Sequence, residues 1–211
     1  GIDQPKHSAQ NVGEISAFKT TEAMDVVTGK TKGYTRTILF VKPELVVVYD
    51  RLTADDPTFY EYWLHAQNEM KVSGQRSIRV NNDDVECEID FLWPLNLELS
   101  QTDQYDPNPR PRVTLREWHL TAVTDGLEDS MEFITLYRPH KSSDTVPDDA
   151  EIERVRGGYA LRAALTDGEF TALLPVEDGV RMSGFGMAGD TLTASIKREN
   201  GTVESIEMND Q

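Results

Sequence analysis

The chain has 211 residues, 38% of them hydrophobic and 27% charged, which suffices for a sizeable core and is typical of a folded domain. Its formal net charge of −16 repels phosphate backbones and anionic lipids, so we expect neither nucleic acid nor a membrane surface as a partner. No run of 18 apolar residues is present, so no membrane-spanning helix is predicted. The single cysteine, Cys87, excludes an internal disulfide.

In chain order, the first clear element is the segment 45–49, which is apolar without a break and β-branched at three positions. Such a short run predicts a strand that is covered on both faces. Pro43 has no amide hydrogen to donate, so it is expected between strands rather than inside one. Asp50 and Arg51 are expected to end the buried strand where it reaches water.

An aromatic-rich strand is predicted over residues 59–65. Period-two alternation puts Phe59, Glu61, Trp63 and His65 on one face of it. The rings of Trp63 and Tyr62 would suit contact with a sugar, and His65 would lie beside Trp63. The alternative is that these rings belong to core and edge packing and that His65 is a structural histidine.

Residues 85–91 alternate strictly between apolar and acidic side chains. This alternation predicts a half-buried strand. Cys87 falls on its apolar side and is therefore expected in the core rather than at a reactive site.

Residues 101–112 form a proline-interrupted loop, and residues 140–149 form a second polar loop. The only concentration of basic and aromatic side chains lies in and after the first loop: Arg110, Arg112, Arg116, Trp118 and His119. Arginine binds carboxylates and sulfates bidentately, so this segment is a candidate contact for an acidic sugar. Alternatively, these arginines pair with the acidic residues of the same loop.

Asx-Gly pairs mark the turns of the C-terminal part. Asp167-Gly168 and Asn200-Gly201 each separate two apolar strand-like runs, and their glycines are expected to supply the positive φ of tight hairpins. Strands bounded by turn signals about every 8–12 residues, without a long helical stripe, predict an all-β fold. We therefore predict one large antiparallel β-sandwich domain over residues 1–211.

Catalytic signatures are absent from the sequence. It contains no phosphate-binding glycine loop, HExxH, paired Cys-x-x-Cys or Gly-x-Ser-x-Gly motif. Four histidines occur, and no two of them share a metal-ligand spacing: His7, His65, His119 and His140. We predict no catalytic residue, no metal site and no cofactor in this chain.

Residues 34–51 (YTRTILFVKPELVVVYDR) resemble a passage of heparinase II/III-like polysaccharide lyases. In that passage an arginine-led strand and a Lys-Pro turn precede an apolar strand that ends in Asp-Arg. Trp63-Leu64-His65 is similar to the tryptophan–leucine–histidine element that follows in the family, and residues 131–139 are similar to a late strand. The resemblance runs from about residue 12 to residue 175.

The resemblance implies a sandwich of the supersandwich-like type, C-terminal to an α/α-toroid, in a secreted or periplasmic enzyme. Such enzymes cleave uronic-acid polysaccharides by β-elimination, in which a base removes a proton and an acid protonates the leaving oxygen. The family's catalytic and zinc-binding His-x-His and His-Asn-Thr stretches do not occur in this sequence. None of those residues is therefore carried over, and the resemblance implies a non-catalytic domain that packs against a toroid and helps form the substrate cleft.

Two other hypotheses remain open. One is an independent carbohydrate-binding module with Trp63, Trp93 or Trp118 as a stacking platform, and the other is a structural or partner-binding sandwich. The lyase hypothesis predicts an apolar patch without a partner, whereas the binding module predicts an exposed aromatic platform. The charge of −16 favours a uronate chain over a heavily sulfated glycan as the sugar.

Overall fold

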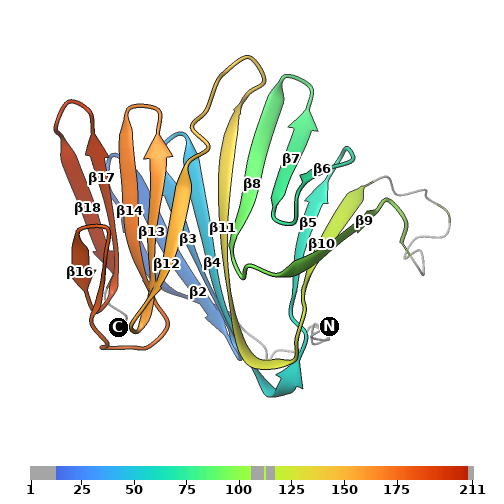
Figure 1. The fold of residues 1–211 in the computed structure, drawn as a ribbon, viewed down its shortest axis with the longest axis horizontal. Coiled ribbons are helices and arrows are strands. Elements are labelled where there is room, and N and C mark those ends of the chain that lie inside the picture. The colour runs from blue at the N-terminus through green and yellow to red at the C-terminus, as the bar shows by residue number, and fades with distance from the viewer. Residues whose placement is uncertain (1–12, 106–111, 113–116, 209–211) are drawn as a thin grey trace.

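The computed structural model describes residues 13–105, 112 and 117–208, and every regular element in these ranges is a β-strand (Figure 1). The predicted all-β class is confirmed, and none of the described residues forms a helix that could cross a membrane. The strands are β1 (Glu14–Thr20), β2 (Met24–Thr31), β3 (Tyr34–Val41), β4 (Leu45–Thr58), β5 (Glu61–Ala66), β6 (Lys71–Ser73), β7 (Ser77–Asn82), β8 (Val85–Trp93), β9 (Leu97–Thr102), β10 (Trp118–Thr124), β11 (Glu128–Lys141), β12 (Ala150–Val155), β13 (Gly158–Leu165), β14 (Gly168–Pro175), β15 (Met182–Gly184), β16 (Met187–Gly189), β17 (Leu192–Arg198) and β18 (Val203–Met208).

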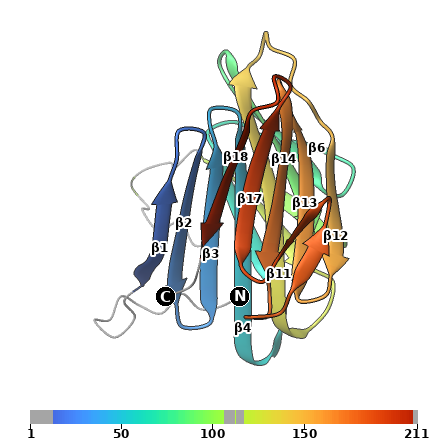
Figure 2. The same cartoon turned by 90° about the vertical axis from the view of Figure 1, so that its left-hand side faces the viewer.

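Four antiparallel sheets are built from these strands. The central sheet has eight strands in the order β1-β2-β3-β4-β11-β8-β7-β6. A five-stranded sheet, β12-β13-β14-β17-β18, packs on one of its faces, and a three-stranded sheet, β5-β10-β9, packs on the other. The hairpin β15-β16 covers the outside of the five-stranded sheet. Figure 2 shows the five-stranded sheet beside β1–β3 of the central sheet.

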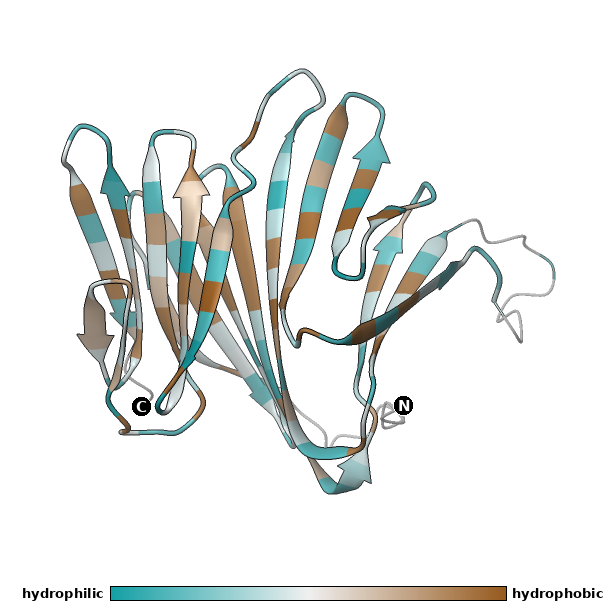
Figure 3. Cartoon of the chain, in the orientation of Figure 1, coloured by the Kyte–Doolittle hydropathy of each residue, from teal (hydrophilic) through white to brown (hydrophobic). Residues whose placement is uncertain are grey.

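Two hydrophobic cores lie on opposite faces of the central sheet, because successive side chains of a strand point to opposite sides. In β11, Ile134 and Leu136 join the core under the five-stranded sheet, whereas Phe133 joins the core under the three-stranded sheet. The same alternation appears as bands of brown and teal along the strands in Figure 3. The period-two pattern of β8 behaves as predicted, since Cys87 packs against the second core.

The three-stranded sheet covers only part of its face of the central sheet. On β1–β4 a set of apolar side chains points away from the five-stranded sheet and joins neither core. We call the six of these that keep surface in water the open face: Ile15, Phe18, Val27, Ile38, Phe40 and Val46. Phe18, Val27 and Ile38 are consecutive cross-strand partners, so the set is contiguous. Ile15 is 73% exposed and Phe18 65% exposed.

The predicted cover on both faces of residues 45–49 fails at one position. Leu45, Val47 and Tyr49 are buried under the five-stranded sheet, and Val48 is 8% exposed on the opposite face. Val46 belongs to the open face and keeps part of its surface in water. The prediction that Asp50 ends the strand at solvent is wrong. β4 continues for eight residues beyond it, and Asp50 is 2% exposed.

Both predicted hairpins are present. Asp167-Gly168 joins β13 to β14, and Asn200-Gly201 lies between β17 and β18. Gly201 has the expected positive φ of 85°. Gly168 has no such φ, and its glycine is required for another reason: a Cβ there would overlap the carbonyl oxygen of Lys197 on the neighbouring strand.

Candidate functional site

The outer face of the three-stranded sheet gathers three of the sequence-predicted site residues. Leu64 on β5 and Leu120 on β10 point into the second core, so their chain neighbours point outward. Trp63 and His65 therefore lie on the outer face of β5. His119 is the direct cross-strand partner of His65, which places it on the same face.

The rings on this face are close together. The Trp63 and His65 rings are 6.4 Å apart between centroids and nearly parallel, at 18°, and His119 lies 6.1 Å from Trp63 and 6.0 Å from His65. Tyr105, from the loop after β9, closes the group with its centroid 4.7 Å from that of His119. We call Trp63, His65, Tyr105 and His119 the ring surface.

Hydrogen bonds fix the members of the ring surface. The indole Nε1 of Trp63 donates to Glu61 Oε2 at 3.0 Å, and the Tyr105 hydroxyl donates to Glu117 Oε2 at 2.5 Å. Glu117 Oε1 also lies 3.8 Å from His65 Nδ1. The hydrogen bond to Glu117 raises the pKa of Tyr105, so this hydroxyl stays protonated at neutral pH.

His119 is the buried member of the ring surface, with 7% of its surface exposed. Its Nε2 lies 3.0 Å from the carbonyl oxygen of Gln104, and this contact selects the tautomer in which Nε2 carries the hydrogen. Its Nδ1 is buried and has no hydrogen-bond partner among the described residues. His65 and Trp63 are, in contrast, about half exposed.

The structure does not bring Trp118, Trp93 or Tyr62 to this surface, and Tyr62 is a buried member of the second core. Trp118 precedes His119 on β10 and packs against the second core, on the opposite side of the sheet. Trp93 packs against the first core, with its ring centroid 5.3 Å from that of Tyr159. Arg112 is exposed, and Arg110 and Arg116 lie outside the described residues.

Sequence reasoning missed Tyr105 and Glu117. Neither residue belongs to a motif, and both reach the ring surface only because the ends of the loop between β9 and β10 meet over His119. The sequence alone could have predicted that Trp118 and His119 lie on opposite faces, because successive side chains of a strand point to opposite sides.

The ring surface offers a half-exposed indole bordered by two imidazoles and two carboxylates. A sugar ring presents C–H groups on one face and hydroxyls at its edge. An exposed aromatic face beside hydrogen-bonding groups therefore matches both parts of a sugar.

A second polar cluster lies where the open face meets β5. Arg36 donates to both carboxylate oxygens of Asp50, at 2.7 and 2.6 Å, and Tyr34 donates to Asp50 at 3.2 Å. Tyr62 and Tyr137 share a hydrogen bond of 2.6 Å beside it. Burial raises the pKa of all three tyrosines, so they remain protonated, and the guanidinium is committed to Asp50. These contacts link β3 to β4 and β5 to β11, so the cluster has a structural role.

One histidine–carboxylate group in the described part of the chain has donor atoms close enough to share a metal ion: Glu86, Glu88 and His140. It lies on β8 and β11 and shares no residue with the ring surface.

Comparison with known proteins gives a match in structure only. No protein-family model and no curated protein matches this sequence. Among solved structures, the heparan sulfate lyase HepC from Pedobacter heparinus matches with a TM-score of 0.58 at 13% identity, over 80% of this chain and 28% of that chain. A heparinase III matches with a TM-score of 0.58 at 12% identity, over 93% of this chain and 27% of that chain. A mutant of HepC gives 0.55 at 14% identity.

The predicted resemblance to heparinase II/III-like lyases is thus confirmed at the level of the fold. This chain spans just over a quarter of the length of the lyases that it matches.

Proposed function

We propose that this chain is the C-terminal β-sandwich of a heparinase II/III-like polysaccharide lyase and that it carries no catalytic residue itself. The fold that it shares with two lyases, over a quarter of their length, is the observation that carries this proposal. The remaining length of such proteins would provide the α/α-toroid with the reacting groups. A protein of this kind would act in the periplasm or outside the cell.

The open face supports a partner domain. Six apolar side chains on four neighbouring strands join neither core, and two of them, Ile15 and Phe18, are largely exposed. Contiguous apolar surface of this kind marks an interaction site in a folded protein. The toroid would cover it, in agreement with the unpartnered apolar patch that the lyase hypothesis predicts.

The ring surface would contact the acidic polysaccharide. Trp63 would stack on a sugar ring, and His65 would face its carboxylate. Arg112, which is exposed in the loop between β9 and β10, would add positive charge for a uronate. The same exposed platform is what an independent carbohydrate-binding module would need, so this second function is kept as the alternative.

The test combines two measurements on the purified chain with a panel of uronate polysaccharides, including alginate and heparan sulfate. Ultraviolet absorbance reports the unsaturated uronate that β-elimination forms, and tryptophan fluorescence reports binding. We expect flat absorbance, with quenching by the uronate chains. Rising absorbance would overturn the non-catalytic assignment.

Two tryptophan variants locate the binding. Trp63→Phe removes the half-exposed indole and should abolish the quenching, whereas Trp93→Phe removes a core-packed indole and should leave it intact. If both variants are quenched equally, the ring surface is not the binding site. Quenching by many unrelated neutral glycans would favour the independent module over the lyase domain.

A further inference from the structure

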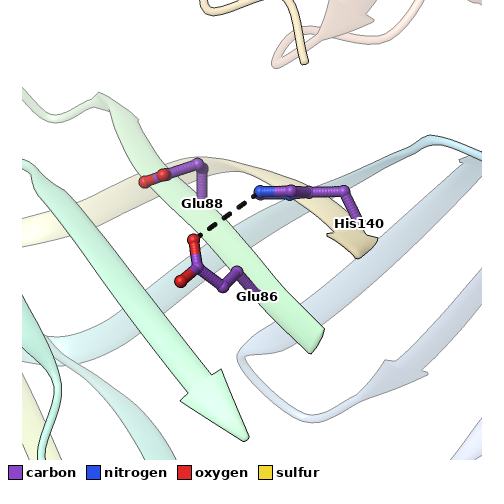
Figure 4. A group of neighbouring side chains, drawn as sticks. All are labelled: Glu86, Glu88 and His140. Carbon is purple, nitrogen blue, oxygen red and sulfur yellow. Dashed lines mark ion pairs between the residues drawn. The ribbon is translucent and has the colours of Figure 1, made fainter. Parts of the chain in front are cut away.

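Strand register brings three potential metal ligands together on β8 and β11. Glu86 and Glu88 lie two residues apart on β8 and so point to the same side of the sheet. His140 on β11 is the direct cross-strand partner of Glu86. The donor atoms of the three side chains all lie within 4.8 Å of one another, and Figure 4 shows the imidazole directed toward Glu86.

The His140 ring is held with one nitrogen free to bind. Its Nδ1 donates to the carbonyl oxygen of Arg138 at 2.8 Å, and its side chain is 8% exposed. Nε2 then faces the carboxylates. Nε2 lies 3.9 Å from Glu86 Oε2, which is too long for a hydrogen bond, and makes none with the described residues.

One carboxylate is also oriented by an outer hydrogen bond. Asn81 donates to Glu86 Oε1 at 3.1 Å, and this leaves Oε2 turned toward His140. A histidine held by a backbone carbonyl, beside a carboxylate held by an amide, is the outer shell that metal ligands in proteins usually have.

We propose that Glu86, Glu88 and His140 form a binding site for a divalent transition metal of the zinc class. One imidazole and two carboxylates are a ligand set of zinc, and the fourth position would be left to water. Zinc bonds of about 2.0–2.2 Å put two tetrahedral ligands about 3.4 Å apart, so the 3.9 Å gap closes by small side-chain rotations. Calcium needs six or more oxygen ligands and fits this set poorly.

Two guanidinium groups lie near the site, and only one competes for its carboxylates. Arg138 is buried and donates to the carbonyl oxygens of Ala164 and Asp149, so it is committed elsewhere. Arg79 contacts both glutamates but is 48% exposed, so it can turn into solvent when a metal ion binds. Arg79 would therefore compete with the metal ion for the two carboxylates and lower the affinity of the site.

The experiment titrates the full chain, first stripped with a chelator, with zinc by calorimetry and with cobalt by visible absorption. We expect one saturable ion per chain and a cobalt spectrum of tetrahedral nitrogen and oxygen coordination. Failure to take up either ion would overturn the proposal.

Variants assign the ion to its ligands. His140→Phe keeps the ring volume and should abolish saturable uptake, and Asn81→Ala should weaken zinc binding about 10- to 100-fold. Arg79→Gln should strengthen zinc binding, an effect that a purely structural ion-pair network would not show. Glu151→Gln removes a carboxylate that pairs with an arginine at 2.6 Å on the five-stranded sheet and should leave affinity unchanged.

The outcomes are decisive even if one variant does not fold. Circular dichroism checks each fold, and Glu88→Gln serves as a second ligand variant if His140→Phe is unstable. Unchanged affinity in a folded His140→Phe or Glu88→Gln protein would place the ion elsewhere and overturn the proposal.

Discussion

The bidentate pair between Arg36 and Asp50 is an asymmetric ion pair, and its two halves should respond differently to substitution. The Asp50 side chain is 3% exposed, whereas that of Arg36 is 42% exposed. In Arg36→Met the carboxylate stays buried with only the Tyr34 hydroxyl as a donor. Removing one partner of a buried pair in this way costs about 3–5 kcal/mol.

Asp50→Asn should cost less. The amide keeps an acceptor oxygen for Arg36, and the guanidinium can take its missing hydrogen bonds from water because it is partly exposed. The loss is then that of one or two hydrogen bonds, about 1–2 kcal/mol. We therefore expect Arg36→Met to lower the free energy of unfolding by about 2 kcal/mol more than Asp50→Asn does.

Urea denaturation followed by tryptophan fluorescence measures this difference. With a slope of about 2 kcal/mol per molar urea, a loss of 4 kcal/mol lowers the midpoint by about 2 M. Arg162→Met is the matched control: its guanidinium is 40% exposed and bonds Glu151 at 2.6 Å, but that carboxylate is 59% exposed. It should cost no more than about 1 kcal/mol. Equal losses in Arg36→Met and Arg162→Met would refute the reasoning.

Three further predictions concern the open face, a hairpin and the cysteine. Phe18→Ser should change the free energy of unfolding by no more than about 0.5 kcal/mol and reduce binding of a hydrophobic dye, whereas Leu39→Ala should cost about 2–5 kcal/mol in urea denaturation. Gly168→Ala should cost about 1–3 kcal/mol, seen as a lower melting temperature, because the new methyl group would meet the Lys197 carbonyl. Burial raises the pKa of the Cys87 thiol to about 11, so alkylation at pH 8 should be slow in the native protein and fast in urea.

Local patterns predicted local structure well. The alternation around Cys87 and the two Asx-Gly turns depend on neighbouring residues alone, and the strands formed there. Alternation separates the two faces of a strand but does not tell which face another sheet covers. For this reason Val46 was expected in a core, and Asp50 was expected at solvent.

The candidate site depended on contacts that no local pattern encodes. His65 and His119 are 54 residues apart, and their meeting requires the register between β5 and β10. Glu86 and His140 meet in the same way, so the absence of a metal-ligand spacing in the sequence did not bear on them. Tyr105 reached the ring surface through a loop, where neither period two nor turn chemistry applies.

The central sheet has a consequence for how the protein unfolds. β4 and β11 are adjacent strands of 14 residues, and each contributes side chains to both cores. Figure 1 shows β11 between the five-stranded sheet on the left and the three-stranded sheet on the right. Unfolding of one core would therefore also remove side-chain contacts from the other. The two cores should unfold in one cooperative transition. The amide hydrogens of β4 and β11 should be among the slowest to exchange with solvent deuterium.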